Sequence, residues 1–272
     1  MDLLLPGTMT VYGRERFLSM TMQLSRHGLQ IGLGIAAMVF AVSAVRADTA
    51  CPIEIQTATQ LVLVSVPSVS RQRATVTRYE RTTSAELWRT LGTGMPAVIG
   101  RKGLGWAPSF RDRATTSAPR KIEGDGKTPG GIFRLSDAFG FNASEIPGYV
   151  RLRPGHEFCV SDPKSPDYNR ILPKKPALSV DGEDMGMIGL YRRGVFIDYP
   201  TNAAERAGSC IFVHVWRSEN SGTSGCVALA QPDVEAIQSW VRSREALIAI
   251  LPSVEAKMIE TCVMAVSLNT NE

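Results

Sequence analysis

The segment SCIFVHVWRSENSGTSGCVAL (residues 209–229) joins two apolar runs through a polar, glycine-containing stretch. In the first run, aliphatic residues alternate with Phe212, His214 and Trp216, and a period of two is typical of a β-strand. The second run begins directly after Cys226 and is also suited to a strand. We therefore expect His214 on a strand and Cys226 at the end of the loop that follows it.

Cys226 and His214 together indicate nucleophilic chemistry. A free thiol has a pKa of roughly 8.5, so nucleophilic cysteines are activated by a neighbouring imidazole or by aligned backbone N–H groups. A hairpin of the two strands would bring His214 beside Cys226. The small residues Thr223, Ser224 and Gly225 would then let backbone N–H groups approach a developing oxyanion. The alternative is a packing histidine and a cysteine that is buried or disulfide-bonded.

A zinc site is a second interpretation of the same region. His156 and Cys159 are separated by two residues. Cys210 and His214 are separated by three, and Cys226 follows, so these spacings are plausible for zinc. In an exported protein, however, Cys159 and Cys210 would more often form a disulfide. We therefore expect no metal and no other cofactor.

The stretch EGDGKTPGG (residues 123–131) contains Gly-Lys-Thr but does not fit a phosphate-binding loop. That motif requires a glycine five positions before Gly126, where Lys121 stands. It also requires a following helix, which Pro129 and two glycines prevent. We predict a turn that leads into a strand.

The loop CVSDPKSPDYNR (residues 159–170) is a candidate substrate-binding segment. Its two prolines and alternating charges are typical of a solvated loop. Tyr168, Asn169 and Arg170 nevertheless offer hydrogen bonds and a cation to an anionic ligand. We expect these three side chains to take part in binding.

The remaining sequence predicts a mainly β fold with a few helices. Short segments rich in β-branched residues recur between turn clusters. They cover residues 60–66, 73–81, 96–100, 131–135, 194–200, 209–216 and 225–229. Helical periodicity is clear from Gln231 to about Arg244, behind Pro232. The simplest organisation is one domain over residues 59–250, followed by a tail over residues 251–272.

The N-terminal region is predicted to be a secretory signal peptide covering residues 1–47. An apolar run (residues 29–45) follows a basic pair and ends in small residues. The alternative is an uncleaved membrane anchor. Translation is expected to begin at Met20 or Met22, and residues 48–58 form a short N-terminal segment of the exported chain. We expect a periplasmic or cell-wall protein without membrane association after cleavage.

Export also determines how the five cysteines are interpreted. In an oxidising compartment an odd number leaves one thiol unpaired. Cys51 and Cys262 lie near the expected termini, which are often close together, and Cys159 and Cys210 form another possible pair. The sequence leaves the connectivity open, and Cys226 is the candidate for the free thiol.

The composition is that of an ordinary globular protein. Of the 272 residues, 44% are hydrophobic and 21% are charged, which suffices for a sizeable core. The formal net charge of +4 does not indicate a nucleic-acid partner.

Taken together, these motifs resemble the L,D-transpeptidase (YkuD-type) catalytic domain. The resemblance runs from PAVIGRKGLG to the helix that contains Trp240. It is carried, in the family's order, by GDGKTPGGIF, SDPKSPDYNR, YRRGVFIDY, GSCIFVHVW and GTSGCVAL. The decisive element is a histidine on a strand followed by a serine- and threonine-rich loop that ends in Gly-Cys. The resemblance is to the branch with a GT-x-GC loop.

The resemblance implies a β-sandwich or barrel-like fold and a cysteine acyltransferase acting on peptidoglycan stem peptides. Cys226 would be the nucleophile and His214 its base, and a thioester would transfer its acyl group to an amine to give a cross-link. Two departures concern Ser224, where the family often has histidine, and Ala228, near which many members have arginine. The alternatives are hydrolysis of the same bond, as by an L,D-carboxypeptidase or amidase, and a non-catalytic peptidoglycan-binding module.

Overall fold

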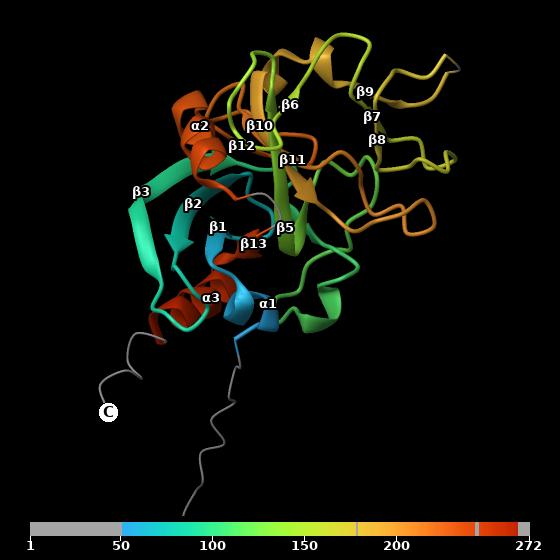
Figure 1. The fold of residues 1–272 in the computed structure, drawn as a ribbon. Coiled ribbons are helices and arrows are strands. Elements are labelled where there is room, and N and C mark those ends of the chain that lie inside the picture. Colours follow the sequence, from blue (N-terminus) through green and yellow to red (C-terminus); the bar gives the residue numbers. More distant parts are fainter. Residues whose placement is uncertain (1–50, 178, 243–244, 266–272) are drawn as a thin grey trace, which may run out of the picture. The chain divides into compact units, whose positions relative to one another are not determined.

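A closed ring of eight strands organises the fold (Figure 1). In spatial order, the ring consists of β10 (Arg193–Asp198), β11 (Phe212–Val215), β12 (Val227–Leu229), β3 (Arg89–Val98), β2 (Arg73–Glu80), β1 (Gln60–Val66), β13 (Ala246–Pro252) and β5 (Thr128–Gly140). Two further strands of this ten-stranded sheet, β4 (Leu104–Trp106) and β6 (Val150–Arg151), pair with β5 outside the ring. The computed structural model describes residues 51–177, 179–242 and 245–265; the predicted signal peptide at residues 1–47 lies outside them.

The ring closes because β5 is long enough to belong to two neighbours. The first half of its 13 residues pairs with β13, where Phe133 lies opposite Ile248. The second half pairs with β10, where Ala138 lies opposite Val195. The register shifts between Val195 and Ile197, where two residues of β5 (Ser136 and Asp137) lie opposite one residue of β10, so β5 carries a bulge. The mainly β, barrel-like fold expected from the sequence is thereby confirmed.

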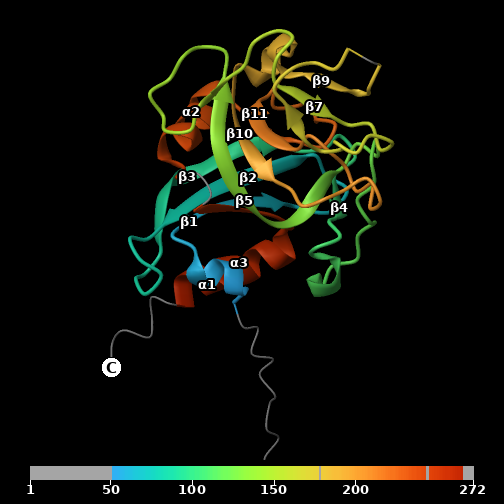
Figure 2. The ribbon, with the colours of Figure 1, turned by 45° about the vertical axis from the view of Figure 1, so that its right-hand side comes forward.

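A small second sheet and short 3₁₀ helices cover one end of the ring, and two helices cover the other (Figures 1 and 2). The second sheet has the order β8 (Ile171–Leu172), β7 (Phe158–Val160), β9 (Gly182–Asp184). The 3₁₀ helices η2 (Met185–Met187) and η3 (Gly189–Arg192) follow it, whereas η1 (Arg111–Arg113) lies at the other end, where Arg113 pairs with Glu54. The helices at the other end are α1 (Ile53–Thr57) and α3 (Ser253–Ala265), whereas α2 (Gln231–Trp240) contacts β10, β11 and β12. None of the described helices is long and apolar enough to span a bilayer.

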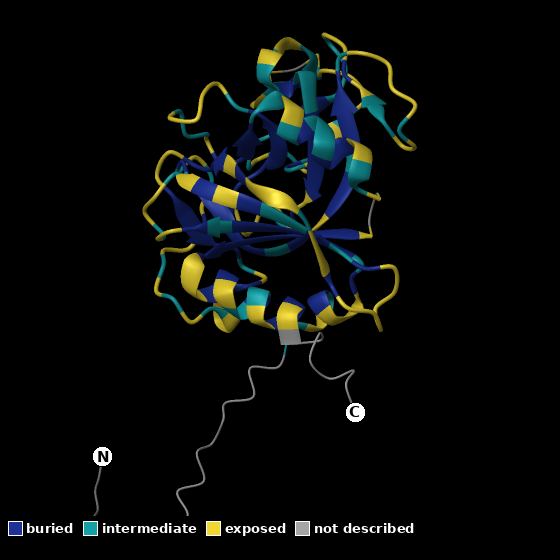
Figure 3. Cartoon of the chain, turned by 90° about the vertical axis from the view of Figure 1, so that its left-hand side faces the viewer, coloured by how far each residue is buried: buried dark blue, intermediate teal, exposed yellow. Residues whose placement is uncertain are grey.

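The described residues form two apolar clusters, one on each face of β11. Val213 and Val215 belong to the larger cluster, which also receives one face of α3. Phe212 belongs to the smaller cluster beneath η3, with Tyr191 and Cys226. In Figure 3 the ring strands are largely buried, and the helix that leads to the C-terminus shows exposed residues on its outward side. The alternation expected for this strand is confirmed.

Two features differ from the sequence expectation. β11 and β12 are parallel neighbours rather than a hairpin, because the connection at residues 216–226 returns to the starting end of β11 before β12 begins. The chain also continues as β13 across the expected boundary at residue 250, and then as α3. The apolar run of β13 has no period of two, since α3 and the ring cover both of its faces.

Candidate active site

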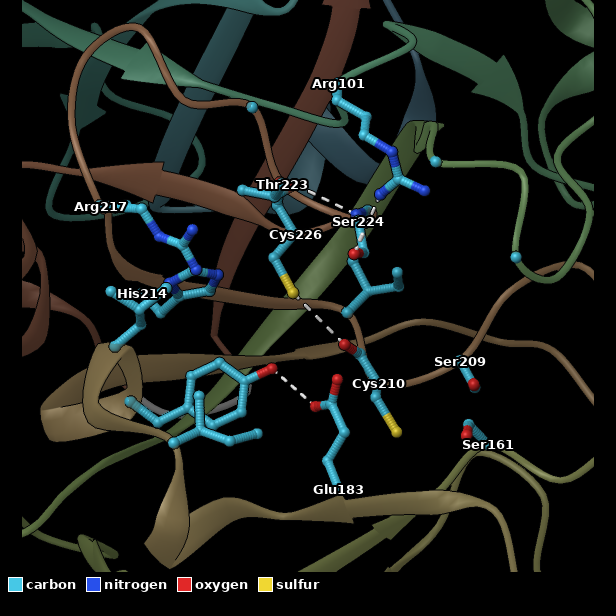
Figure 4. A pocket seen from close by; sticks show the side chains of 18 of the residues that line it. Arg101, Ser161, Glu183, Ser209, Cys210, His214, Arg217, Thr223, Ser224 and Cys226 are labelled. Carbon is cyan, nitrogen blue, oxygen red and sulfur yellow. Dashed lines mark hydrogen bonds between the residues drawn. The ribbon is translucent and has the colours of Figure 1, made fainter.

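A pocket of about 390 Å³ opens where the connection between β11 and β12 ends (Figure 4). The side chains important for its chemistry are Cys226, His214, Tyr191, Glu183, Arg101 and Arg217. They come from the ends of β11 and β12, from η3 and β9, and from the turn after β3. The predicted nucleophile and base therefore face one cavity.

Two threonines fix the backbone of Cys226. The Thr223 hydroxyl donates to the Cys226 carbonyl at 2.6 Å, and the fully buried Thr128 hydroxyl donates to the same oxygen at 3.3 Å. Thr128 also accepts the Gly100 N–H at 2.8 Å, which ties β5 to the turn after β3. The GKTPGG stretch thus serves as a support for the cysteine loop, and Thr128 had no sequence signal beyond its place before a strand.

The parallel register places His214 and Cys226 on the same face of the sheet. His214 lies opposite Ala228, and Cys226 lies two residues before Ala228, so their side chains point to the same side. The Nδ1 atom of His214 is 2.8 Å from the Val215 carbonyl oxygen. Because a carbonyl only accepts, Nδ1 carries the hydrogen and Nε2 keeps a free electron pair. Nε2 of the imidazole is therefore able to accept a hydrogen bond.

Burial keeps both groups uncharged in the resting site. It lowers the pKa of His214 to about 4, although the Val215 contact acts in the opposite direction. Burial raises the pKa of the Cys226 thiol to about 12, and the nearby Glu183 raises it further. At neutral pH the pair is therefore a thiol and a neutral imidazole.

The sulfur of Cys226 is held by the backbone and a tyrosine. The thiol donates to the Cys210 carbonyl at 3.3 Å, and the Phe212 N–H donates to the sulfur at 3.4 Å (Figure 4). The Tyr191 hydroxyl also interacts with the sulfur, and it donates to Glu183 at 2.6 Å. These contacts fix the orientation of the Cys226 sulfur.

The Tyr191 ring and the half-buried carboxyl group of Glu183 complete this wall. The ring packs edge-on against the His214 imidazole, with centroids 5.1 Å apart. The pKa of Glu183 is raised, first by burial and also by the charge of Glu123, against the effect of its bond from Tyr191. Tyr191 begins the YRRGVFIDY motif, but no local pattern assigned it or Glu183 to the site, because each reaches the pocket from an element far from Cys226 in the chain.

Guanidinium groups lie on the opposite side of the cysteine loop. Arg101 donates to Ser224 at 3.2 Å, and its guanidinium lies against the backbone of Gly126, where a Cβ would approach within 3.1 Å. Arg217 is exposed and lines the pocket beside His214. Planar guanidinium groups bind carboxylates with two hydrogen bonds, so this side of the pocket suits an anionic group.

The other loop residues expected near the oxyanion are all part of the pocket wall. Thr223, Ser224 and Gly225 each line it. Thr223 accepts the Gly225 N–H at 3.1 Å, so this donor is engaged in the resting site. Space around Gly225 is limited as well, because a Cβ there would lie 3.0 Å from Ile211 Cδ1 and 3.2 Å from the Lys127 carbonyl oxygen.

Tyr168, Asn169 and Arg170 lie outside the pocket wall. The Tyr168 hydroxyl donates to Glu123, which does line the pocket. Asn169 accepts the Cys210 N–H at 3.0 Å, whereas Arg170 is exposed and paired with Asp167. Two of the three residues therefore support the site from behind.

The structure forms the two cysteine pairs that the sequence left open as possibilities. Cys51 and Cys262 form a disulfide with a Cα–Cα distance of 5.6 Å, and Cys159 and Cys210 form another at 6.0 Å. Cys226 is the free cysteine of the described residues. Because Cys159 and Cys210 are bonded to each other, they cannot act as the zinc ligands considered above. The described residues contain no group of three or more His, Cys, Asp or Glu side chains arranged for a metal ion.

The comparison with protein families agrees with this geometry. The family model of the L,D-transpeptidase catalytic domain (YkuD) matches residues 64–250. The chain belongs to this family. The match includes β11, the cysteine loop and β12, and hence the whole of the described pocket.

Solved structures and curated proteins add little to this assignment. Bd1075 of Bdellovibrio bacteriovorus is 16% identical (TM-score 0.37), and the match covers 77% of this chain and 55% of that one. The helical cell shape determining protein Pgp2 of Campylobacter jejuni is 17% identical (TM-score 0.36), and the match covers 72% of this chain and 48% of that one. An L,D-transpeptidase of Mycobacterium smegmatis is 16% identical (TM-score 0.29), and the match covers 71% of this chain and 59% of that one. This chain thus spans about half the length of these structures, and no curated protein matches it.

Proposed function

We propose that this L,D-transpeptidase family member forms cross-links in peptidoglycan by cysteine acyl transfer between stem peptides. The observation that carries the proposal is the pairing of a free, buried Cys226 with a histidine whose Nδ1 is bound to a carbonyl. That arrangement leaves Nε2 to accept the thiol proton. Membership of the L,D-transpeptidase catalytic family and the expected signal peptide support action in the periplasm or cell wall.

In the first half of the reaction the donor peptide is cleaved. The thiol proton of Cys226 moves to His214 Nε2 while the sulfur bonds to the donor carbonyl carbon. Backbone N–H groups of the cysteine loop stabilise the resulting oxyanion. The C–N bond to the terminal amino acid then breaks, its nitrogen takes the proton from His214, and a thioester remains.

In the second half the thioester transfers its acyl group. The amine of another stem peptide attacks the thioester carbonyl, and its proton passes to His214. The C–S bond breaks, Cys226 regains its proton from the imidazolium, and the cross-linked peptide leaves. Water attacking in place of the amine would give a shortened peptide, which is the hydrolytic alternative.

The charged side chains of the pocket suit a stem peptide. Arg101 and Arg217 offer guanidinium groups to a terminal carboxylate of the donor. Glu123 and Glu183, on the other side of Cys226, offer acceptors to an amine. A diamino acid linked to a carboxy-terminal amino acid carries both kinds of group.

The test is a product analysis with purified protein, monomeric and dimeric stem peptides, and mass spectrometry. The unchanged protein should give a new dimer, whereas Cys226→Ser should give none because a serine hydroxyl is a far weaker nucleophile in this site. Lys257→Ala, an exposed change on α3, is the matched control and should keep full activity. Shortened monomers alone, even with excess acceptor amine, would establish the hydrolytic alternative, and dimer formation by Cys226→Ser would refute the nucleophile.

A further inference from the structure

The peptide of Cys210 has an unusual conformation beside the catalytic sulfur. Cys210 has a φ of +55°, in the left-handed region that non-glycine residues rarely adopt. Its carbonyl oxygen accepts the hydrogen of the Cys226 thiol at 3.3 Å. The residue is buried, and an isolated left-handed residue of this kind persists only where its surroundings impose it.

A disulfide and a side-chain hydrogen bond impose this conformation. The side chain of Cys210 is bonded to Cys159 on β7, which belongs to the second sheet. Its N–H donates to the Asn169 side chain at 3.0 Å, and the Asn169 amide in turn donates to the Tyr199 carbonyl at 2.9 Å. Asn169 itself has a φ of +62°, which asparagine tolerates better than most residues. The polar loop at residues 159–170 therefore holds Cys210 from both its side chain and its backbone.

We propose that Asn169 and the Cys159–Cys210 disulfide are positioning residues for the nucleophile: they aim the Cys210 carbonyl at Cys226 and keep the resting thiol protonated. This inference rests on the proposed role of Cys226. A hydrogen bond to the neutral form of a group disfavours its ionisation, and a carbonyl can bond only the protonated sulfur. The proton is released to His214 when substrate enters and displaces this contact.

Protonation of Cys226 also protects the disulfide beside it. A Cys226 thiolate could attack one sulfur of the Cys159–Cys210 bridge, forming a new S–S bond and releasing the other sulfur as a thiolate. The thiol form does not carry out this exchange. A free thiol and a disulfide can therefore coexist in one pocket wall.

The other charged or titratable groups near Cys226 are unchanged by the test variants. His214 faces it from β11, Tyr191 from η3 and Glu183 from β9. Lys121, on the segment before β5, also acts on the thiol and is bonded to Asp125 at 2.7 Å, and Arg101, Arg217 and Glu123 line the same pocket. A change in thiol reactivity in these variants therefore reports on the Cys210 peptide.

The experiment measures alkylation of Cys226 by iodoacetamide between pH 7 and 9, with the modified peptide identified by mass. Asn169→Gly removes the side chain that binds Cys210 but tolerates the left-handed backbone. Cys159→Ala/Cys210→Ala removes the nearby disulfide and keeps Cys226 as the free thiol. Cys51→Ala/Cys262→Ala is the matched control, because it removes the disulfide at the other end of the ring. Both disulfide deletions should lower stability, so the rates are compared under conditions where urea unfolding shows each variant to be folded.

Asn169→Gly and the nearby disulfide deletion should each speed alkylation about tenfold at a given pH, which corresponds to a pKa lower by about one unit. The logarithm of the rate should still rise linearly with pH, since the thiol stays buried, and the remote deletion should leave the rate unchanged. Unchanged rates in both test variants would overturn the proposal. So would an equal acceleration in the remote deletion, or a plateau above about pH 8.5, the range of an exposed thiol. Alkylation requires no peptide turnover, so it tests the positioning role separately from the proposed function. If the variants show the expected faster alkylation but the unchanged protein does not process stem peptides, the proposed function is rejected and the positioning role is not.

Discussion

Acidification should destabilise the protein through His214. The pKa of this histidine is about 4 in the folded protein and near 6.5 in the unfolded chain, because burial opposes its charged form. The unfolded chain therefore binds the proton first as pH falls. The stabilisation is complete above about pH 6.5 and is lost progressively as the pH falls toward 4. At 1.36 kcal/mol per pKa unit, the loss reached at pH 4 is about 3 kcal/mol.

The measurement is urea unfolding at a series of pH values from 7 to 4 for the unchanged protein and for His214→Gln. Glutamine does not titrate. Over this range the free energy of unfolding of the variant should therefore fall by about 3 kcal/mol less than that of the unchanged protein. Comparing the two slopes removes the contribution of every other group and any constant effect of the substitution. Lys257→Ala, at an exposed residue of α3, is the control substitution and should follow the unchanged protein.

Parallel stability curves for the unchanged protein and His214→Gln would refute the reasoning. They would mean that His214 takes up its proton in the folded protein as readily as in the unfolded chain. The imidazole would then be charged over much of the acidic range, and its place as a neutral base beside the thiol would have to be abandoned.

Two further predictions concern the terminal disulfide and the pocket charge. Cys51→Ala/Cys262→Ala should lower the free energy of unfolding by ~5 kcal/mol in the chain-entropy estimate, because the bridge closes a sequence separation of 211 residues. Urea unfolding tests this, and a loss below about 1 kcal/mol would contradict it. Arg217→Ala should raise KM about tenfold for donor peptides with a free terminal carboxylate and leave their carboxamides unaffected. Equal losses for acid and amide donors would show that Arg217 does not bind the carboxylate.

Local patterns predicted most of the strands and the two central catalytic candidates. Alternation is a property of a few consecutive residues, so the faces of β11 followed directly from the positions of Val213 and His214. The direction of the next strand did not, because hydropathy has the same pattern whether two strands run parallel or antiparallel. The loop at residues 216–226 decides that direction through its contacts with the turn after β3.

The supporting residues could not be predicted because their partners are distant in sequence. Tyr168 and Asn169 are polar residues in a polar loop, and such residues are usually exposed. Here their partners are Glu123 and the Cys210 backbone, which the fold brings behind the pocket. Glu183 and Tyr191 reach Cys226 in the same way. Their roles depend on tertiary contacts, which have no periodic signature in the chain.

The disulfide between Cys51 and Cys262 closes most of the described chain into a covalent loop. These cysteines lie at the start of the first helix and within the last, so nearly all described residues fall inside the loop that they close. A single proteolytic cut in an exposed surface segment would open this covalent loop, but the disulfide would keep the two fragments joined. The nicked chain would be a circular permutant whose new ends lie at the cut and whose old ends stay joined. In a compartment that contains proteases, such a domain can keep all its strands together after a cleavage that would divide an unbridged chain.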